Sequence, residues 1–164
     1  MKDLLNKYLH EREIYLLLVE YCCALDSMDL DAIAKLFSED CIVDFGTDKQ
    51  LNSIGSKELA KSLERMWRWK RTSHHLSNVK INLIGDNKAF SKSYVYAWHE
   101  RFDNTTATIY GQYHDELIRK YDKWLITKRT MYMNGSDSNF KVKIFPLERK
   151  EPPLNWEPPK IDEN

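Results

Sequence analysis

The chain has 164 residues, in which 25 Lys and Arg balance 25 Asp and Glu, so its formal net charge is zero. This length suits one domain with a sizeable core, and the missing positive field disfavours a dedicated nucleic-acid binder. The longest uninterrupted apolar run, 14–19, is far shorter than the roughly 20 residues that span a membrane.

The N-terminal residues and the cysteines bear on the cellular compartment. Residues 1–7 show no apolar signal core, which predicts a cytoplasmic protein. Cys22 and Cys23 are adjacent and Cys41 stands alone, a spacing that favours neither a disulfide framework nor a zinc site. We therefore interpret the cysteines as small buried apolar residues.

The first half of the chain predicts three helices and one short strand. Apolar residues at helical spacing predict a helix over 12–25. Asp29 is expected to cap a second helix over 31–37, and residues 41–45 alternate as a strand. Ser56 is expected to cap a third helix that reaches about Arg71.

From His74 onward the pattern changes to period two. Strands are predicted over 79–83, 89–102, 107–120 and 124–133, separated by turn sequences that give an antiparallel meander. Helices followed by a curled sheet indicate an α+β fold. One face of the second strand carries Phe90, Tyr94, Tyr96 and Trp98, and covering such a face predicts a homo-oligomer.

The last segment has a different composition. All five prolines lie after position 145, at 146, 152, 153, 158 and 159. Proline excludes a central strand or a long helix. We expect a domain over 1–135 and an extended C-terminal arm over 136–164 that packs on its own or a neighbouring subunit.

Asp26 is the first candidate for chemistry. It lies four residues after Cys22, so a helix that persists to this point carries the carboxylate on its apolar side. An unpaired charge is costly there. An ordinary role in the turn 26–29 explains the same residue, and judged alone this structural role is favoured.

Four histidines, His74, His75, His99 and His114, fall in or near the predicted strands. A histidine base needs one free ring nitrogen, and a carboxylate on the other nitrogen stabilises the imidazolium. Asp26 could supply that carboxylate. For His99 and His114 we favour half-buried structural roles, and no spacing typical of a metal site is present.

Residues 65–71 alternate cations with aromatic residues. Single-stranded nucleic acid is bound by such patterns, but the C-terminal end of an amphipathic helix looks the same. The balanced total charge favours the helix end. Serine nucleophile motifs and phosphate-binding glycine loops are absent from the sequence.

Three stretches of the chain resemble a known family. These are 21–40 with its acidic turn, the strand entry Thr72-Ser73-His74-His75-Leu76-Ser77-Asn78, and 111–117 followed by 124–126. They are similar to the SnoaL-like family of the nuclear transport factor 2-like superfamily, which includes scytalone dehydratase and hexachlorocyclohexane dehydrochlorinase. The resemblance covers about residues 10–133. It implies a cone: a strongly curved mixed sheet with three N-terminal helices over its concave face.

The resemblance also implies a catalytic pair and a pocket. By resemblance His74 would remove a proton from carbon, and Asp26 would orient its imidazole. The candidate substrate-binding residues around this pair are Tyr21, Phe45, Trp67, Asn78, His99 and Tyr113. No metal or other cofactor is expected. One departure is Leu25, which replaces the tyrosine that precedes the aspartate in scytalone dehydratase, so scytalone itself is not expected as substrate.

Two classes of function follow. The first is a cofactor-independent dehydratase or isomerase acting on a small hydrophobic oxygenated ring compound, with a polyketide cyclase as the related alternative. The second is a non-catalytic binding or assembly module, whose cavity would be filled by Trp67, Trp69 and Trp98. Family members form dimers or trimers, so a homodimer or homotrimer is expected, without nucleic-acid or membrane partners.

Overall fold

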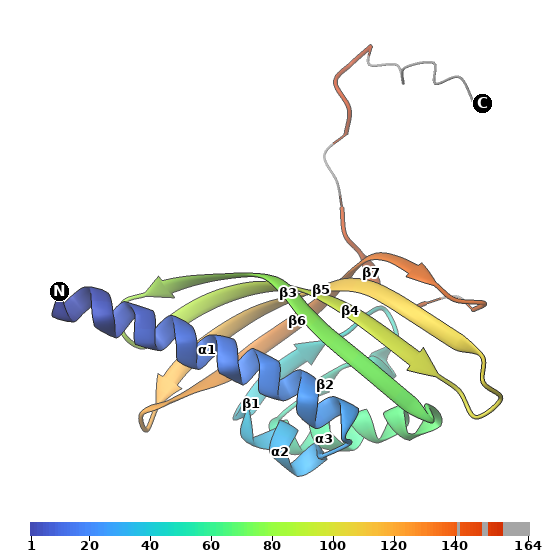
Figure 1. Cartoon of the computed structure of the whole chain (residues 1–164), viewed down its shortest axis with the longest axis horizontal. Coiled ribbons are helices and arrows are strands. Elements are labelled where there is room, and N and C mark those ends of the chain that lie inside the picture. The colour runs from blue at the N-terminus through green and yellow to red at the C-terminus, as the bar shows by residue number, and fades with distance from the viewer. Residues whose placement is uncertain (141, 149–150, 156–164) are drawn as a thin grey trace.

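The computed structural model describes residues 1–140, 142–148 and 151–155, which form an α+β fold. The helices lie against one side of a large curved sheet, and the chain leaves the sheet on the other side after its last strand (Figure 1). This arrangement confirms the predicted cone-like architecture. No helix within the described ranges combines the length and the apolar character needed to cross a bilayer.

The helices are α1 (Lys2–Asp26), α2 (Leu30–Lys35) and α3 (Ser56–Leu63), with short 3-10 turns η1 (Lys49–Leu51) and η2 (Glu64–Arg68). The helix predicted over 12–25 is confirmed, although α1 begins ten residues earlier. Asp29 caps α2 as predicted, because its carboxylate accepts a hydrogen bond from the Ala32 amide at 2.9 Å.

The third helix differs from the prediction at both ends. Gly55, not Ser56, is the N-cap residue, and no side chain caps α3. The α-helix ends at Leu63 rather than near Arg71. Near Lys70 the chain joins the sheet instead, because the Lys70 amide donates to the Glu100 carbonyl oxygen at 2.7 Å.

Within the described residues, seven strands form one sheet: β1 (Phe37–Asp44), β2 (Ser53–Ile54), β3 (Arg71–Ile84), β4 (Lys88–Glu100), β5 (Thr106–Lys120), β6 (Lys123–Asp137) and β7 (Phe145–Pro146). The order is β2-β1-β6-β5-β4-β3, and β7 also pairs with β6. The meander of β3 to β6 is antiparallel as predicted. The sheet is mixed because β1 and β7 run parallel to β6.

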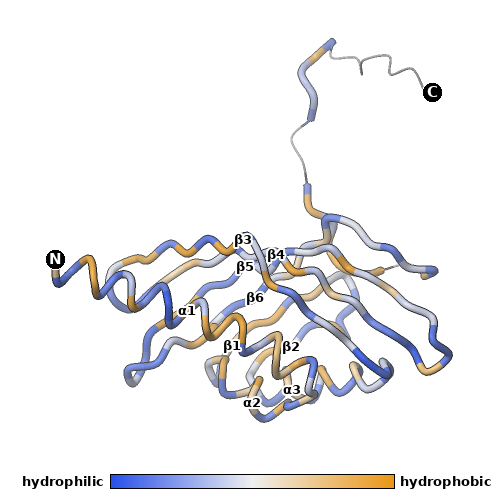
Figure 2. Tube along the Cα trace, in the orientation of Figure 1, coloured by the Kyte–Doolittle hydropathy of each residue, from blue (hydrophilic) through white to orange (hydrophobic). Residues whose placement is uncertain are grey.

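The core lies between the helices and the concave face of the sheet. Ala89, Val95 and Ala97 of β4 are buried there, whereas Phe90 and Tyr94 alternate with them on the exposed convex face. Hydrophobic and hydrophilic residues also alternate along the strands of the sheet (Figure 2). The homo-oligomer that we infer from these exposed aromatic residues remains a prediction.

Residues 142–147 of the C-terminal arm pack on their own chain, whereas residues 151–155 are exposed and extend away from the sheet (Figure 1). Val142 and Ile144 lie against the core, and the Thr47 amide donates to the Lys143 carbonyl oxygen at 3.0 Å. Strand β6 extends to Asp137, two residues into the predicted arm. The arm's prolines 158 and 159, with Trp156, lie outside the described residues.

Candidate active site

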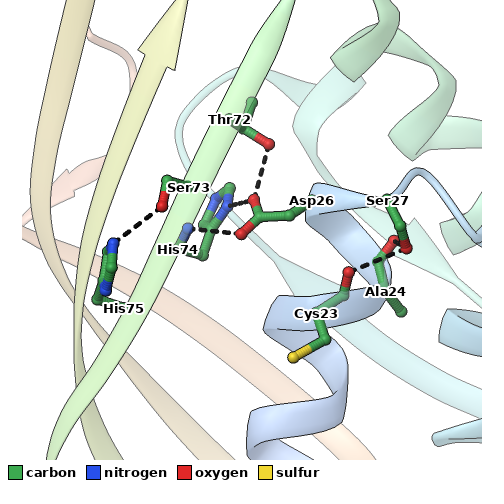
Figure 3. A network of polar contacts seen from close by, with 8 residues as sticks. All are labelled: Cys23, Ala24, Asp26, Ser27, Thr72, Ser73, His74 and His75. Carbon is green, nitrogen blue, oxygen red and sulfur yellow. Dashed lines mark hydrogen bonds and ion pairs between the residues drawn. The ribbon is translucent and has the colours of Figure 1, made fainter.

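Asp26 is the last residue of α1, and the turn after it directs its side chain toward β3 (Figure 3). The apolar stripe that includes Leu18 and Cys22 is buried against the sheet, which fixes the rotation of the helix. The Asp29 amide donates to the Ala24 carbonyl oxygen at 2.8 Å and closes the turn. The carboxylate therefore projects from a rigid helix end onto the first residues of β3.

Asp26 and His74 are joined by two hydrogen bonds. Asp26 Oδ1 lies 2.6 Å from His74 Nδ1, and Asp26 Oδ2 accepts from the His74 amide at 2.8 Å. The Thr72 hydroxyl donates to Oδ1 at 2.7 Å (Figure 3). Because the carboxylate accepts, this network assigns the proton to Nδ1 and leaves Nε2 without a hydrogen-bond partner among the described residues.

The electrostatics of the pair keep Asp26 ionised. Burial raises the pKa of this carboxyl, but the hydrogen bonds from the His74 ring, the His74 amide and Thr72, with the charge of His74, outweigh it and lower the pKa. Exposed fractions are 4% for the His74 side chain and 27% for Asp26. An ionised carboxylate here stabilises the imidazolium that forms when His74 takes up a proton.

His74 lines a cavity of about 420 Å³ on the concave side of the sheet. That volume suits a small organic ligand. Most of the wall is apolar or aromatic and comes from α1, η1, α3, η2, the sheet, adjoining loops and the arm: Tyr21, Leu25, Phe45, Leu51, Leu63, Met66, Trp69, Ala97, Ala107, Ile109, Tyr113, Met131, Phe140, Val142 and Ile144. Of the sequence candidates, His74, Tyr21, Phe45, His99 and Tyr113 share this cavity.

His99 is buried beside His74, with the two rings edge to face at 5.4 Å between centroids. Burial, and then the charge of His74, lower the pKa of His99 to about 4. Its Nδ1 is buried without a partner among the described residues. His99 is therefore neutral at physiological pH.

Two of the predicted substrate-binding residues, Trp67 and Asn78, do not line this cavity. Trp67 is 61% exposed, because η2 turns it toward solvent instead of extending α3. Asn78 sits at a bulge of β3 with a left-handed φ of 48°, and it lines a separate groove beside Tyr8 and Tyr15 of α1. The other two strand histidines, His75 and His114, do not line the cavity, and His75 lies on the side of β3 away from Asp26 (Figure 3).

The largest feature that the sequence did not reveal is a buried ion pair beneath the cavity wall. Arg129 binds Asp115 through two hydrogen bonds of 2.7 and 2.9 Å, and both side chains are 0% exposed. The guanidinium lies 4.1 Å from the ring centre of Tyr21 and 4.3 Å from that of Tyr113. The pair therefore supports the two tyrosines that line the cavity.

The site therefore combines a histidine that is hydrogen-bonded to a carboxylate with a largely apolar cavity on the concave side of a curved sheet. Comparison with known proteins gives the family. A SnoaL-like domain model matches residues 7–130. The chain belongs to this family, which has the nuclear transport factor 2-like fold. No curated protein sequence matches the chain.

Solved structures agree with the family assignment. A candidate scytalone dehydratase from Novosphingobium aromaticivorans is 26% identical, with a TM-score of 0.84 over 92% of this chain and 100% of that chain. The type 3 hexachlorocyclohexane dehydrochlorinase from Novosphingobium barchaimii is 16% identical, with a TM-score of 0.72 over 87% and 99%. The similarity to the dehydrochlorinase concerns the fold alone. The first structure, at 26% identity, is of a protein named for a dehydration reaction.

Proposed function

We propose that this protein is a cofactor-independent dehydratase or isomerase that acts on a small hydrophobic oxygenated ring compound. One observation carries the proposal: Asp26 holds His74 Nδ1 at 2.6 Å while the same imidazole lines the cavity. A base that is oriented on one nitrogen and free on the other meets the geometric requirement for general acid–base catalysis.

In the proposed reaction, His74 Nε2 takes a proton from a ring carbon beside a carbonyl group. The electron pair of the broken C–H bond then forms a double bond and expels a hydroxyl group from the neighbouring carbon. The imidazolium returns its proton to the departing hydroxyl group, which leaves as water. For isomerisation, the proton returns to another carbon, and Asp26 stabilises the imidazolium in both cases.

Neutral donors around the cavity would bind the substrate oxygen. His99 stays uncharged because burial lowers its pKa to about 4. Burial raises the pKa of Tyr21, and the nearby Arg129 reduces this rise without reversing it, so Tyr21 also stays uncharged. Such groups can hydrogen-bond a carbonyl oxygen on which negative charge develops while remaining protonated themselves.

The alternative of a non-catalytic binding module predicted a cavity filled by tryptophans. Trp67 is exposed and Trp98 does not line the cavity, while Trp69 forms part of its wall. The space of about 420 Å³ and the unpartnered side of His74 favour the enzyme. A polyketide cyclase would use the same base on a linear substrate.

The test is turnover of a panel of β-hydroxy ketones built on one or two rings, followed by absorbance of the conjugated product. We expect His74→Ala to lower kcat/KM by about 10²- to 10⁴-fold, and Asp26→Asn to lower it by about 10²-fold or more. His75→Ala is the matched control, because His75 is exposed and points away from the cavity (Figure 3). Ring compounds that bind without turnover would support the binding module instead.

A further inference from the structure

The cavity carries an excess of positive charge, although the chain as a whole is neutral. Three cationic side chains line it, Arg65, Arg68 and Lys143, against the single carboxylate of Asp48. Lys143 Nζ bonds Asp48 Oδ2 at 2.9 Å, so that pair is balanced. In the part of the chain that the structure describes, no carboxylate forms an ion pair with either arginine.

Arg65 is held in place rather than free in solvent. One of its terminal nitrogens donates to both the backbone oxygen and the hydroxyl group of Ser62. Its guanidinium lies 5.8 Å from the ring centre of Phe45, on the cavity wall. Burial lowers the pKa of Arg65, yet a guanidinium keeps its charge at any physiological pH. Arg65 therefore presents a fixed, partly desolvated charge with N–H donors to spare.

Arg68 belongs to the same 3-10 turn, and its Nε donates to the Arg65 carbonyl oxygen at 2.9 Å. A helix end attracts cations, but this explanation does not require them to line a cavity. The sequence alternative of nucleic-acid binding needs residues 65–71 on one exposed face. Arg65 instead contributes to the cavity, while Arg71 pairs with Glu100 at the sheet edge.

We propose that the substrate carries a carboxylate attached to its ring, and that Arg65 and Arg68 bind this group while the ring occupies the apolar part of the cavity. This inference rests on the proposed function, because it names the substrate class of the same site. Guanidinium groups match carboxylates in geometry and charge. A small inorganic anion would leave the aromatic wall formed by Phe45 and Trp69 without a contact, whereas a ring would pack against it.

The experiment compares 2-naphthoate with its uncharged isostere 2-naphthamide by isothermal titration calorimetry. We expect the wild type to bind the carboxylate about tenfold more tightly or better, as charge-assisted hydrogen bonds imply. In Arg65→Met/Arg68→Met the two affinities should become equal. Arg68→Met alone, which removes a single exposed side chain, should lose part of the preference without a packing change.

Lys57→Met is the matched control, since Lys57 is an exposed cation of α3 that does not line the cavity. It should keep the full preference. Equal binding of the amide by the wild type, or a preference that survives the loss of both arginines, would overturn the proposal. Inorganic phosphate that binds as tightly as 2-naphthoate would also overturn it, by showing a general anion site.

This result is separable from the enzyme assignment. His74→Ala should keep the preference for 2-naphthoate, because His74 is not part of the proposed carboxylate subsite. A retained preference without turnover of any ring substrate contradicts the catalytic role and supports the subsite. Turnover of neutral ring ketones by a protein that shows no carboxylate preference contradicts the subsite and supports the catalytic role.

Discussion

Two pairs on the concave side of the sheet, each formed by a carboxylate and a nitrogen-bearing side chain, differ in what surrounds them. Asp115 and Arg129 are fully buried and joined by two hydrogen bonds, and Arg129 Nη1 has no partner among the described residues. Asp26 and His74 share one ring hydrogen bond, and the Asp26 side chain keeps 27% exposure. The first pair is fully buried, whereas in the second pair His74 Nε2 has no hydrogen-bond partner among the described residues.

The difference separates a structural pair from one that we propose to be reactive. Burial lowers the pKa of Arg129, but the charge of Asp115 and its hydrogen bonds outweigh it and raise the pKa, so the guanidinium keeps its proton. A buried guanidinium that keeps its proton cannot exchange it near neutral pH. An imidazole that is held by a carboxylate and faces a cavity can do so.

The largest expected change in stability concerns the buried pair of Asp115 and Arg129. Arg129→Met leaves the Asp115 carboxylate buried without its partner, and should lower the free energy of unfolding by about 3–5 kcal/mol. Asp26→Asn should cost about 1 kcal/mol, because that carboxylate is partly solvated. Urea denaturation at neutral pH measures both changes.

Arg129→Met/Asp115→Leu is the control for this prediction. Removing both charges should restore much of the stability lost in Arg129→Met, since no buried charge is then left unpaired. If Arg129→Met were no less stable than Asp26→Asn, the two pairs would not differ in the way their burial indicates.

The second prediction concerns pH. Burial and the charge of His74 lower the pKa of His99 to about 4, below the ordinary value near 6.5. Between these values the unfolded chain binds the proton and the folded chain does not. Stability should therefore fall as pH falls through this window, by about 3 kcal/mol from pH 7 to pH 4.

Denaturation midpoints over this pH range measure the effect, with His99→Gln as the comparison. That variant should lose most of the decline, while the part that comes from His114, whose pKa burial also lowers, should remain. An identical decline in wild type and His99→Gln would show that His99 is not held neutral by the fold.

The smallest expected effect concerns the arm that completes the cavity. A Cβ at position 46 would collide with the Lys143 carbonyl oxygen, which accepts a hydrogen bond from the Thr47 amide. Gly46→Ala should therefore loosen the arm at a cost of about 1 kcal/mol or more. Faster hydrogen exchange at Thr47 is the expected sign. Gly135→Ala is the control, because a Cβ there meets no atom within 4 Å, and equal exchange in both variants would contradict the close contact.

Much of the fold was predictable because its elements are locally encoded. Period-two alternation located the meander, and Asp29 located the start of α2. The end of α3 was not predictable from helical spacing, because the 3-10 turn that follows has three residues per turn and moves Trp67 off the buried face.

The site shows the same division. Asp26 and His74 were identified by their resemblance to a family motif, while the partnership of Asp115 with Arg129 depends on a strand register. Counting back from the turn at 121–122 without irregularity would place Asp115 opposite Lys128. A register shift between Glu116 and Leu117 brings Arg129 opposite Asp115 instead, and a one-residue slip reverses which face a side chain occupies.

The central claim is that Asp26 fixes His74 with Nε2 free, and the ring tautomer tests it most directly. A long-range ¹H–¹⁵N spectrum of the protein labelled at histidine distinguishes the two ring nitrogens of the neutral imidazole. We predict that His74 carries its proton on Nδ1 in the wild type, and that Asp26→Asn lowers the population of this tautomer. A proton on Nε2 in the wild type, or a tautomer that Asp26→Asn leaves unchanged, would contradict the account.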